Sequence, residues 1–273
     1  IAGMQKLGAT ISLEHGYITA EASRLRGADI QFEKKTVGGT ENLLMAASLA
    51  KGRTLIIGAA KEPEVEELAR VLNKMGASIS GAGTDTIVIQ GAESLHPVDH
   101  AIIPDRIETG TYLAVAAATG GEVTLLGTTL DLLEAVAAKM KEAGIVLSGA
   151  EGGVTVKADS RLRGTDVRTA PYPGFPTDMQ AQFMALMAAA DGESVFEETI
   201  FENRFMHVPE LVRMGARIEV HGATAVVTGV ERLEAAQVQA TDLRASASLI
   251  IAALAAEGTS EVHRLYHLDR GYE

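Results

Sequence analysis

The sequence contains no cysteine and no tryptophan, and aromatic residues make up only 4% of its 273 residues. Without cysteine, these residues can form neither a disulfide framework nor a thiolate metal site, and they supply no cysteine nucleophile. Positive charge is also scarce, because 24 Lys and Arg residues stand against 36 Asp and Glu residues, a net charge of −12. This balance argues against a general nucleic-acid or membrane-surface binder, since both need broad positive potential.

Long hydrophobic runs are absent as well. The longest apolar stretches, such as residues 249–256, are far shorter than the roughly 20 residues that cross a bilayer. No charged segment followed by an apolar one opens the sequence, so we expect a cytoplasmic protein. The composition is 47% hydrophobic and 22% charged, which excludes intrinsic disorder and allows a sizeable aliphatic core.

Four short segments resemble one another and recur at a nearly constant spacing. Their glycines are Gly8, Gly76, Gly144 and Gly215, which stand 68, 68 and 71 residues apart. After each glycine we expect a pair of alternating strands, a short extended element, an Ala-rich helix, a strand that starts at a glycine and an acidic amphipathic helix. This order predicts a repeated β-α-β-α-β-β unit, and a period near 70 residues favours small layered lobes over a solenoid.

The ends of the sequence fall at unusual places in this repeat. The predicted Ala-rich helices cover residues 41–49, 108–118, 178–190 and 243–256. Residues 1–6 look like the end of a helix, and residues 269–273 occupy the position at which an acidic helix begins in the repeat. We therefore expect the sequence to be part of a larger protein, because a native chain rarely begins inside one helix and stops at the start of another.

The residues before the Ala-rich helices combine helix caps with cations. These helix starts are residues 34–40, 104–111, 175–180 and 241–246. Thr, Asp and Gly at such positions are ordinary N-caps, and capping is the simplest interpretation of each start alone. Three of the starts also carry Lys or Arg, which is unfavourable beside the positive end of a helix dipole unless an anion binds there. If the helices lie side by side, the starts form a small positive pocket that suits a phosphorylated small substrate.

Familiar cofactor and metal motifs are missing. The sequence has no P-loop, no dinucleotide-binding glycine motif and no HExxH, and its seven histidines show no ligand spacing. We therefore expect neither a cofactor nor a metal. His207 is a candidate neighbour of the site, with a core histidine as the alternative.

Four strings resemble the UDP-N-acetylglucosamine 1-carboxyvinyltransferases, a family of enolpyruvyl transferases. They are FPTDMQAQF (175–183), FENRFMH (201–207), TDLRASAS (241–248) and LDRGYE (268–273), and the resemblance continues along the whole sequence. The related enolpyruvylshikimate-phosphate synthases share the fold but not these strings. The resemblance implies an α/β fold of two inside-out lobes, each built from β-α-β-α-β-β repeats around buried parallel helices. Residues 1–103 are then the later part of the first lobe, and residues 104–273 are most of the second.

The resemblance also implies an activity. The expected reaction transfers the enolpyruvyl group from phosphoenolpyruvate to the 3-hydroxyl of UDP-N-acetylglucosamine with release of phosphate, the first committed step of peptidoglycan synthesis. Two alternatives are an enolpyruvyl transferase with another acceptor and a catalytically silent paralogue that binds a UDP-sugar. Compared with the family, roughly the first third and a short C-terminal stretch are missing. We therefore expect these 273 residues to be inactive alone.

Catalytic roles follow from the resemblance at the positions that match. Asp178 resembles the general base that takes the proton from the attacking sugar hydroxyl, and Asp242 resembles a group for a second proton transfer. A helix cap is the alternative role for each. Arg270 resembles an arginine that contacts the phosphate or carboxylate of phosphoenolpyruvate, with Arg204 and Arg244 as its expected neighbours.

The sugar nucleotide is expected to contact two further segments. The loop that lies along the uridine diphosphate in this family matches Lys34, Lys35, Thr36, Val37 and Gly38. The family often has an aliphatic residue where this sequence has Lys35. Ile200 matches a position whose backbone carbonyl meets the sugar amide, with an ordinary strand residue as the alternative.

Overall fold

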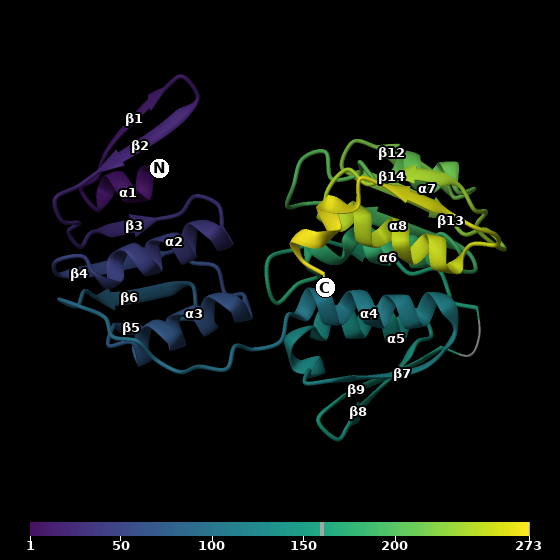
Figure 1. The fold of residues 1–273 in the computed structure, drawn as a ribbon, viewed down its shortest axis with the longest axis horizontal. Coiled ribbons are helices and arrows are strands. Elements are labelled where there is room, and N and C mark those ends of the chain that lie inside the picture. Colours follow the sequence, from purple (N-terminus) through teal and green to yellow (C-terminus); the bar gives the residue numbers. More distant parts are fainter. Residues whose placement is uncertain (159–160, 273) are drawn as a thin grey trace. The chain divides into compact units, whose positions relative to one another are not determined.

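The computed structural model describes residues 1–158 and 161–272, so Glu273, the last residue of one of the four strings, lies outside the described residues. The chain divides into two compact units, Ile1–Ile103 and Pro104–Glu273, which are described separately (Figure 1). Within the described residues, none of the helices combines the length and the apolar character needed to cross a membrane.

The first unit contains a short helix, a hairpin and one complete β-α-β-α-β-β repeat. The helix α1 (Ala2–Lys6) leads into the hairpin of β1 (Thr10–Glu14) and β2 (Tyr17–Glu21). The repeat consists of β3 (Asp29–Gln31), α2 (Val37–Ser48), β4 (Arg53–Ile57), α3 (Pro63–Lys74), β5 (Ser78–Ser80) and β6 (Thr86–Gln90). Its strands pair in the order β3-β4-β6-β5, with β3 parallel to β4 and the other two pairs antiparallel.

The second unit contains one complete copy of this plan and two partial copies. The first copy consists of α4 (Arg106–Thr119), β7 (Gly121–Leu126), η1 (Leu130–Leu132), α5 (Glu134–Glu142), β8 (Val146–Ala150) and β9 (Gly153–Ala158). The second consists of β10 (Val167–Arg168), η2 (Thr177–Met179), α6 (Gln180–Met187), β11 (Glu193–Glu197), α7 (Val208–Arg213), β12 (Arg217–His221) and β13 (Thr224–Thr228). The third consists of β14 (Gln237–Gln239), α8 (Leu243–Ala255), β15 (Glu261–His263) and η3 (Leu265–Arg270).

The strand orders confirm the repeat predicted from the glycine spacing. The sheet β10-β11-β13-β12 reproduces β3-β4-β6-β5 strand by strand, with the same parallel first pair. The sheet β7-β9-β8 has the same order without a first strand, and β14-β15 is the parallel pair alone.

The four repeat glycines end helices. Each has a positive φ between +87° and +105°, a conformation that glycine adopts without a Cβ clash. At Gly76, the glycine N–H donates to the Asn73 carbonyl (3.1 Å), and the next N–H, of Ala77, donates to the Leu72 carbonyl (2.9 Å). The other three copies bond in the same way, so each glycine satisfies the last carbonyls of a helix and turns the chain into a strand.

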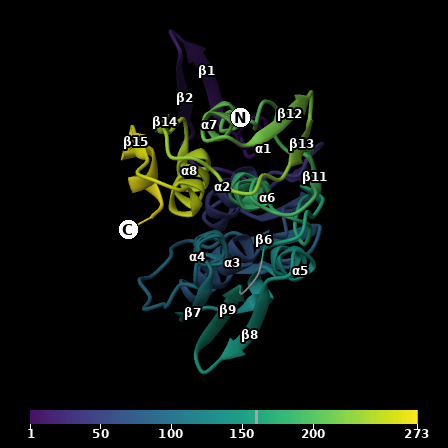
Figure 2. The ribbon, with the colours of Figure 1, turned by 90° about the vertical axis from the view of Figure 1, so that its right-hand side faces the viewer.

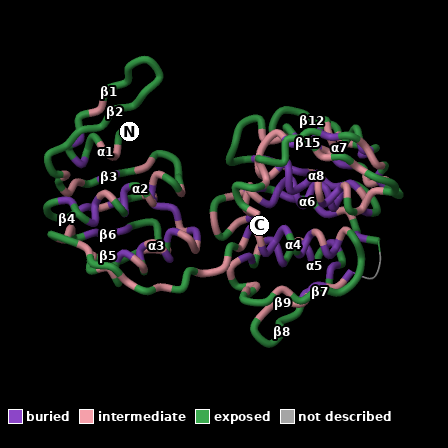
Figure 3. The backbone as a smooth tube through the Cα atoms, in the orientation of Figure 1, coloured by how far each residue is buried: buried purple, intermediate pink, exposed green. Residues whose placement is uncertain are grey.

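In the second unit, helices lie inside and sheets lie outside. Viewed nearly end-on, α4, α6 and α8 lie together, and the strands of the unit surround them (Figure 2). All eight residues of α6 are buried, whereas much of the strand surface is exposed (Figure 3). The core is mainly aliphatic, with Phe183 of α6 lying between the rings of Phe175 and Phe196. This arrangement confirms the inside-out α/β fold that the resemblance implied.

Several helix bounds differ from the sequence prediction. α2 begins at Val37 instead of residue 41, because the Thr36 hydroxyl already caps it by accepting the Gly39 N–H (3.2 Å). Val37 and Gly38 therefore belong to the first helical turn rather than to a loop, and the contact of residues 34–38 with the sugar nucleotide stays a prediction. α4 likewise begins at Arg106, two residues early, and α6 ends at Met187, three residues early.

Candidate functional site

The starts of three buried helices converge at one end of the second unit. The Thr111 hydroxyl of α4 lies 2.8 Å from the Tyr272 hydroxyl and accepts a hydrogen bond from Gln182 Nε2 of α6 (3.2 Å). The same amide donates to the Asp178 carbonyl (2.8 Å). Arg244, in the first turn of α8, reaches the Tyr272 hydroxyl with Nη1 (3.5 Å). The convergence predicted from the sequence is thus confirmed for the three helix starts of this unit.

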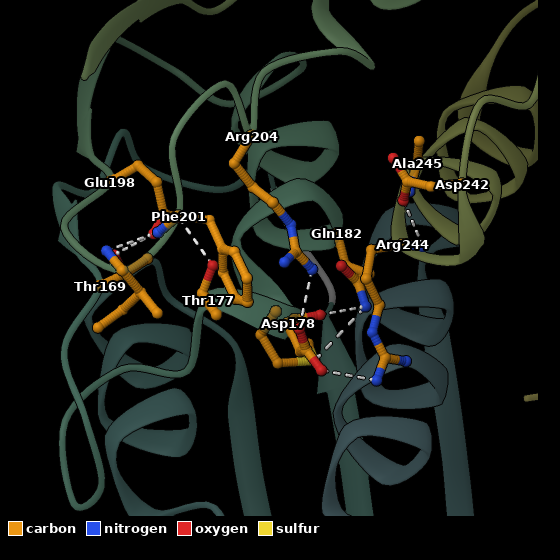
Figure 4. Close-up of polar contacts among 12 residues, drawn as sticks. Thr169, Thr177, Asp178, Gln182, Glu198, Phe201, Arg204, Asp242, Arg244 and Ala245 are labelled. Carbon is orange, nitrogen blue, oxygen red and sulfur yellow. Dashed lines mark hydrogen bonds and ion pairs between the residues drawn. The ribbon is translucent and has the colours of Figure 1, made fainter. Parts of the chain in front are cut away.

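Asp178 lies between two arginines at this convergence (Figure 4). Its Oδ1 accepts a hydrogen bond from Arg204 Nη2, and its Oδ2 accepts one from Arg244 Nη2, both at 2.8 Å. The exposed fractions of these side chains are 37% for Asp178, 22% for Arg204 and 17% for Arg244. The carboxylate therefore remains open to solvent on one side while each of its oxygens is held by a guanidinium.

Asp178 does not cap a helix. Neither η2 nor α6 has a side-chain cap, and their N-cap positions are occupied by Pro176 and Met179. The other three helix starts are capped, by Thr36 for α2, Asp105 for α4 and Asp242 for α8. The capping alternative therefore describes three starts and leaves the Asp178 carboxylate for another role.

The arginines determine the protonation behaviour of Asp178. Burial by itself raises the pKa of Asp178, but the charges and hydrogen bonds of Arg244 and Arg204 outweigh burial and hold the pKa below its ordinary value of 3.8. For Arg244, burial lowers the pKa, but the Asp178 carboxylate outweighs it and raises the pKa. Asp178 is thus ionised at neutral pH and is a weak base while both guanidiniums hold it.

Arg204 also contacts an exposed aromatic ring. Its guanidinium carbon lies 4.8 Å from the centre of the Phe201 ring, and the ring is 52% exposed. Stacking on one face and an ion pair at one edge fix the orientation of this guanidinium. The Phe201 ring therefore helps to keep the positively charged Arg204 guanidinium beside Asp178.

Glu198 is a buried carboxylate that sequence reasoning missed. It is 4% exposed and lies between the Thr177 hydroxyl and the backbone of residues 200–201 (Figure 4). The signal was present in the sequence, because Ser194, Phe196 and Glu198 continue one alternation and all three are buried. An acidic residue on the inward phase of a strand indicates a carboxylate with dedicated partners.

The remaining predicted residues of this unit are less closely connected. Asp242 Oδ1 accepts the N–H groups of Arg244 (2.9 Å) and Ala245 (3.0 Å), so the structure shows its capping role. Arg270, at the end of η3, is exposed and makes no hydrogen bond or ion pair with any residue that the structure describes. Ile200 is 40% exposed. A second proton transfer by Asp242 and a substrate contact by Arg270 stay predictions.

His207 behaves as a core histidine. It is 2% exposed, and its Nε2 lies 3.3 Å from Met184 Sδ. Burial lowers its pKa from 6.5 to about 4, so the ring is neutral at physiological pH. The alternative given for this residue in the sequence analysis therefore agrees with the structure.

In the first unit, the predicted nucleotide loop carries a second cluster of cations around a carboxylate. Asp85 Oδ1 pairs with Lys35, and its Oδ2 pairs with Lys61 Nζ (2.8 Å). These two lysines lower the pKa of Asp85 through their hydrogen bonds and charges. Lys34 is exposed, and Thr36 is occupied as the cap of α2. Lys35 thus has a partner within the protein before any ligand is considered.

Metal ligands do not gather anywhere in residues 1–158 and 161–272. No group of three or more His, Cys, Asp or Glu side chains in this part of the chain could hold a metal ion.

Two solved structures share this fold. The enolpyruvyl transferase NikO from Streptomyces tendae matches with a TM-score of 0.90 and 29% identity over 99% of this chain and 67% of its own. EPSP synthase from Acinetobacter baumannii matches with a TM-score of 0.71 and 18% identity over 98% of this chain and 66% of its own, a likeness of fold alone. Buried helices within repeated sheets, with arginines at the converging helix starts, thus place the protein in the enolpyruvyl-transferase fold class.

Sequence comparison then defines the family. The family profile of EPSP synthase (3-phosphoshikimate 1-carboxyvinyltransferase) matches residues 1–273, and the chain belongs to this family. A UDP-N-acetylglucosamine 1-carboxyvinyltransferase from Sorangium cellulosum is 63% identical over 100% of this chain and 65% of its own length. One from Thermodesulfovibrio yellowstonii is 58% identical over 100% of this chain and 66% of its own length. The chain therefore spans 65% to 66% of the length of these curated relatives.

Proposed function

We propose that the protein to which this chain belongs transfers the enolpyruvyl group from phosphoenolpyruvate to the 3-hydroxyl of UDP-N-acetylglucosamine, as a cytoplasmic step of peptidoglycan synthesis. Relatives with this name share 63% and 58% identity with the whole chain. The observation that carries the proposal is the Asp178 carboxylate, which caps no helix and lies between Arg204 and Arg244. We also propose that residues 1–103 belong to the first lobe of such a transferase and residues 104–273 to the second.

Asp178 acts as the general base in this account. The 3-hydroxyl oxygen forms a bond to C2 of phosphoenolpyruvate while its proton passes to the carboxylate, and an acid protonates C3. In the second step C3 loses a proton to a base, for which Asp242 is the candidate, the bond from C2 to the phosphate oxygen breaks, and the enolpyruvyl ether and phosphate form. A carboxylate that is about one-third exposed beside two partly buried arginines supports this role.

The two arginines link substrate binding to the basicity of Asp178. Arg204 and Arg244 have planar guanidiniums that match phosphate and carboxylate oxygens. When an anionic substrate takes their donors, Asp178 loses the groups that hold its pKa down, and its pKa rises. The base therefore becomes stronger when its reaction partner is bound. Arg270 adds a further cation, since η3 packs against α8 and the hydroxyl of Tyr272, two residues after Arg270, lies 3.5 Å from Arg244 Nη1.

Residues of the first unit bind the sugar nucleotide in this proposal. Lys34 and Lys35 precede α2, and the N-terminus of a helix favours an anion beside it. Lys35 and Lys61 already share one carboxylate, that of Asp85. A diphosphate would exchange with Asp85 for these lysines. Ile200 of the second unit offers its backbone carbonyl to the sugar amide.

The test is turnover by the full-length gene product that contains this chain. Purified protein is mixed with phosphoenolpyruvate and UDP-N-acetylglucosamine, and the product is followed by phosphate release and by the mass of the enolpyruvyl ether. Shikimate 3-phosphate replaces the sugar nucleotide in the control. Turnover with the sugar nucleotide and none with the control supports the proposal, and the reverse preference would contradict it.

A further inference from the structure

We propose that Glu198 is a positioning residue that holds two parts of the site in register, the Asp178 segment and the backbone of residues 200–201. The roles assigned to those two parts rest on the proposed function. Glu198 follows β11 and is 4% exposed, so its carboxylate touches no substrate and acts through its neighbours. No other buried carboxylate in the described part of the second unit has this set of bonds to the site.

Both oxygens of Glu198 are occupied by donors. Oε2 accepts the Thr177 hydroxyl (2.9 Å), from the residue immediately before Asp178. Oε1 accepts the N–H groups of Ile200 (2.9 Å) and Phe201 (3.1 Å). Oε1 also accepts the Thr169 hydroxyl at 2.9 Å, which connects the carboxylate to the segment after β10. One side chain thus joins three stretches of chain.

The Thr169 end of this network is itself fixed. The Thr169 hydroxyl accepts the Thr199 N–H (2.8 Å), and the Thr199 hydroxyl donates to the Thr169 carbonyl (2.6 Å). Glu198 and Thr199 are therefore attached to Thr169, which follows the edge strand β10, through three hydrogen bonds rather than through packing alone. Through the Thr177 bond, Glu198 connects this hydrogen-bonded segment to the residue immediately before Asp178.

Comparison of the repeats shows that this carboxylate is particular to one of them. In each repeat a glycine stands at or shortly before the strand that follows the Ala-rich helix, at positions 52, 121, 192 and 258. The residues six positions after these glycines are Gly58, Gly127, Glu198 and Arg264. Gly58, Gly127 and Arg264 have φ of +76°, +74° and +63°, whereas Glu198 is not among the residues with positive φ. The other repeats leave the strand through a left-handed residue. Here the chain continues without one, and the side chain of Glu198 bonds the N–H groups that follow.

The two carboxylate oxygens of Glu198 position different parts of the site, so loss of their hydrogen bonds should affect different kinetic constants. The Oε2 bond locates Thr177, and therefore the carboxylate of Asp178 relative to Arg204 and Arg244. The Oε1 bonds locate Ile200 and Phe201, the first with the carbonyl assigned to the sugar amide and the second with the ring under Arg204. Loss of the Oε2 bond should therefore lower kcat, and loss of the Oε1 bonds should also raise KM for the sugar nucleotide.

The experiment compares three variants in the full-length gene product. Thr177→Val removes one hydroxyl and leaves the Oε1 bonds intact, so kcat should fall about tenfold while KM for UDP-N-acetylglucosamine stays within about twofold. Glu198→Ala leaves the N–H groups of Ile200 and Phe201 unpaired, so kcat should fall and KM should rise, each by about tenfold or more. Glu198→Gln should restore both values, because its oxygen accepts the N–H groups and its amide donates to the Thr177 hydroxyl.

Glu67→Ala is the matched control. Glu67 is equally buried and holds His100 Nε2 (2.7 Å) and the Ile103 N–H (3.2 Å) in the first unit, without a bond to the site. The Glu67→Ala variant should be less stable than the wild type but should have the same kcat and KM. Normal kcat in Thr177→Val, or normal kcat and KM in folded Glu198→Ala, would overturn the proposal. If Glu198→Ala does not fold, the result for Thr177→Val decides.

A readout without substrate separates this proposal from the proposed function. The Asp178 carboxyl is titrated by NMR in the wild type, Thr177→Val and Glu67→Ala. Thr177→Val should raise the pKa of Asp178 towards 3.8, because the carboxylate moves away from its arginines, and Glu67→Ala should leave it unchanged. A wild type without turnover contradicts the proposed function alone, whereas an unshifted pKa in Thr177→Val contradicts the positioning role.

Discussion

Asp178 Oδ2 and Arg244 Nη2 lie 2.8 Å apart, although 66 residues separate them in the sequence. Asp178 belongs to the start of the α6 repeat and Arg244 to the start of the α8 repeat, so the bond joins two copies of one structural unit. Arg204, from the segment that leads to α7, completes the arrangement at 2.8 Å from Oδ1. The site thus forms where repeats meet, and no single repeat contains it.

Arg270→Lys is expected to affect one substrate more than the other. Lysine keeps the positive charge but loses the two-pronged donor geometry that matches a phosphate or carboxylate. KM for phosphoenolpyruvate should therefore rise about tenfold or more, and KM for the sugar nucleotide should change little. Arg264→Lys, at a nearby exposed arginine, serves as the control. Equal effects on both substrates would show that Arg270 does not hold the anion.

His207 is expected to make the protein less stable in weak acid. The unfolded chain takes up a proton at the ordinary histidine pKa of 6.5, whereas burial delays protonation of the folded protein until about pH 4. The part of the free energy of unfolding that depends on neutral His207 is fully present above pH 6.5. It is lost as the pH falls from 6.5 towards 4, by on the order of 3 kcal/mol. Urea unfolding at pH 7 and pH 5 measures the part of this loss that falls above pH 5, about 2 kcal/mol. His207→Gln should flatten this dependence and the exposed-site variant His221→Gln should not; a His207→Gln profile as steep as that of the wild type would exclude this origin.

Binding of an anion is expected to raise the pKa of Asp178. In the free protein Arg244 and Arg204 overcome the effect of burial and keep the pKa below 3.8. Phosphoenolpyruvate that takes these donors should move the pKa upward, as followed by NMR titration of the carboxyl group. Sodium chloride at equal ionic strength controls for screening. A pKa that stays low when phosphoenolpyruvate saturates the protein would show that the arginines do not exchange partners.

The repeat could be predicted because its marker is local. A glycine with positive φ at the end of a helix depends on a few neighbouring residues, so Gly76 and Gly144 reveal it in the sequence. The strand pairs could be predicted from alternation for the same reason. Helix starts were less certain, because Thr36 extends α2 by a turn that contains two glycines, which are poor helix formers.

The connections within the site could not be predicted from local pattern. Asp178 and Asp242 each stand at a helix start in the sequence, and only the structure shows that one pairs with arginines while the other caps a helix. Thr111 and Tyr272 are 161 residues apart. Glu198 was missed because its partners lie on three different segments, although its inward strand phase was visible.

Asp178→Asn tests the central claim most directly. Asparagine has nearly the shape of aspartate and accepts hydrogen bonds, but it cannot take a proton from the sugar hydroxyl. The variant is made in the full-length gene product, and Asp105→Asn is its control, since asparagine caps a helix about as well as aspartate. Calorimetry with UDP-N-acetylglucosamine shows whether the variant still binds the sugar nucleotide.

The decisive measurement is the steady-state rate of phosphate release by Asp178→Asn with both substrates. The account predicts a fall of roughly two to four powers of ten in kcat with sugar-nucleotide binding largely kept, and a nearly normal rate for Asp105→Asn. A nearly normal rate for Asp178→Asn would contradict the account, remove Asp178 from the proton transfer and leave Asp242 as the carboxylate to examine.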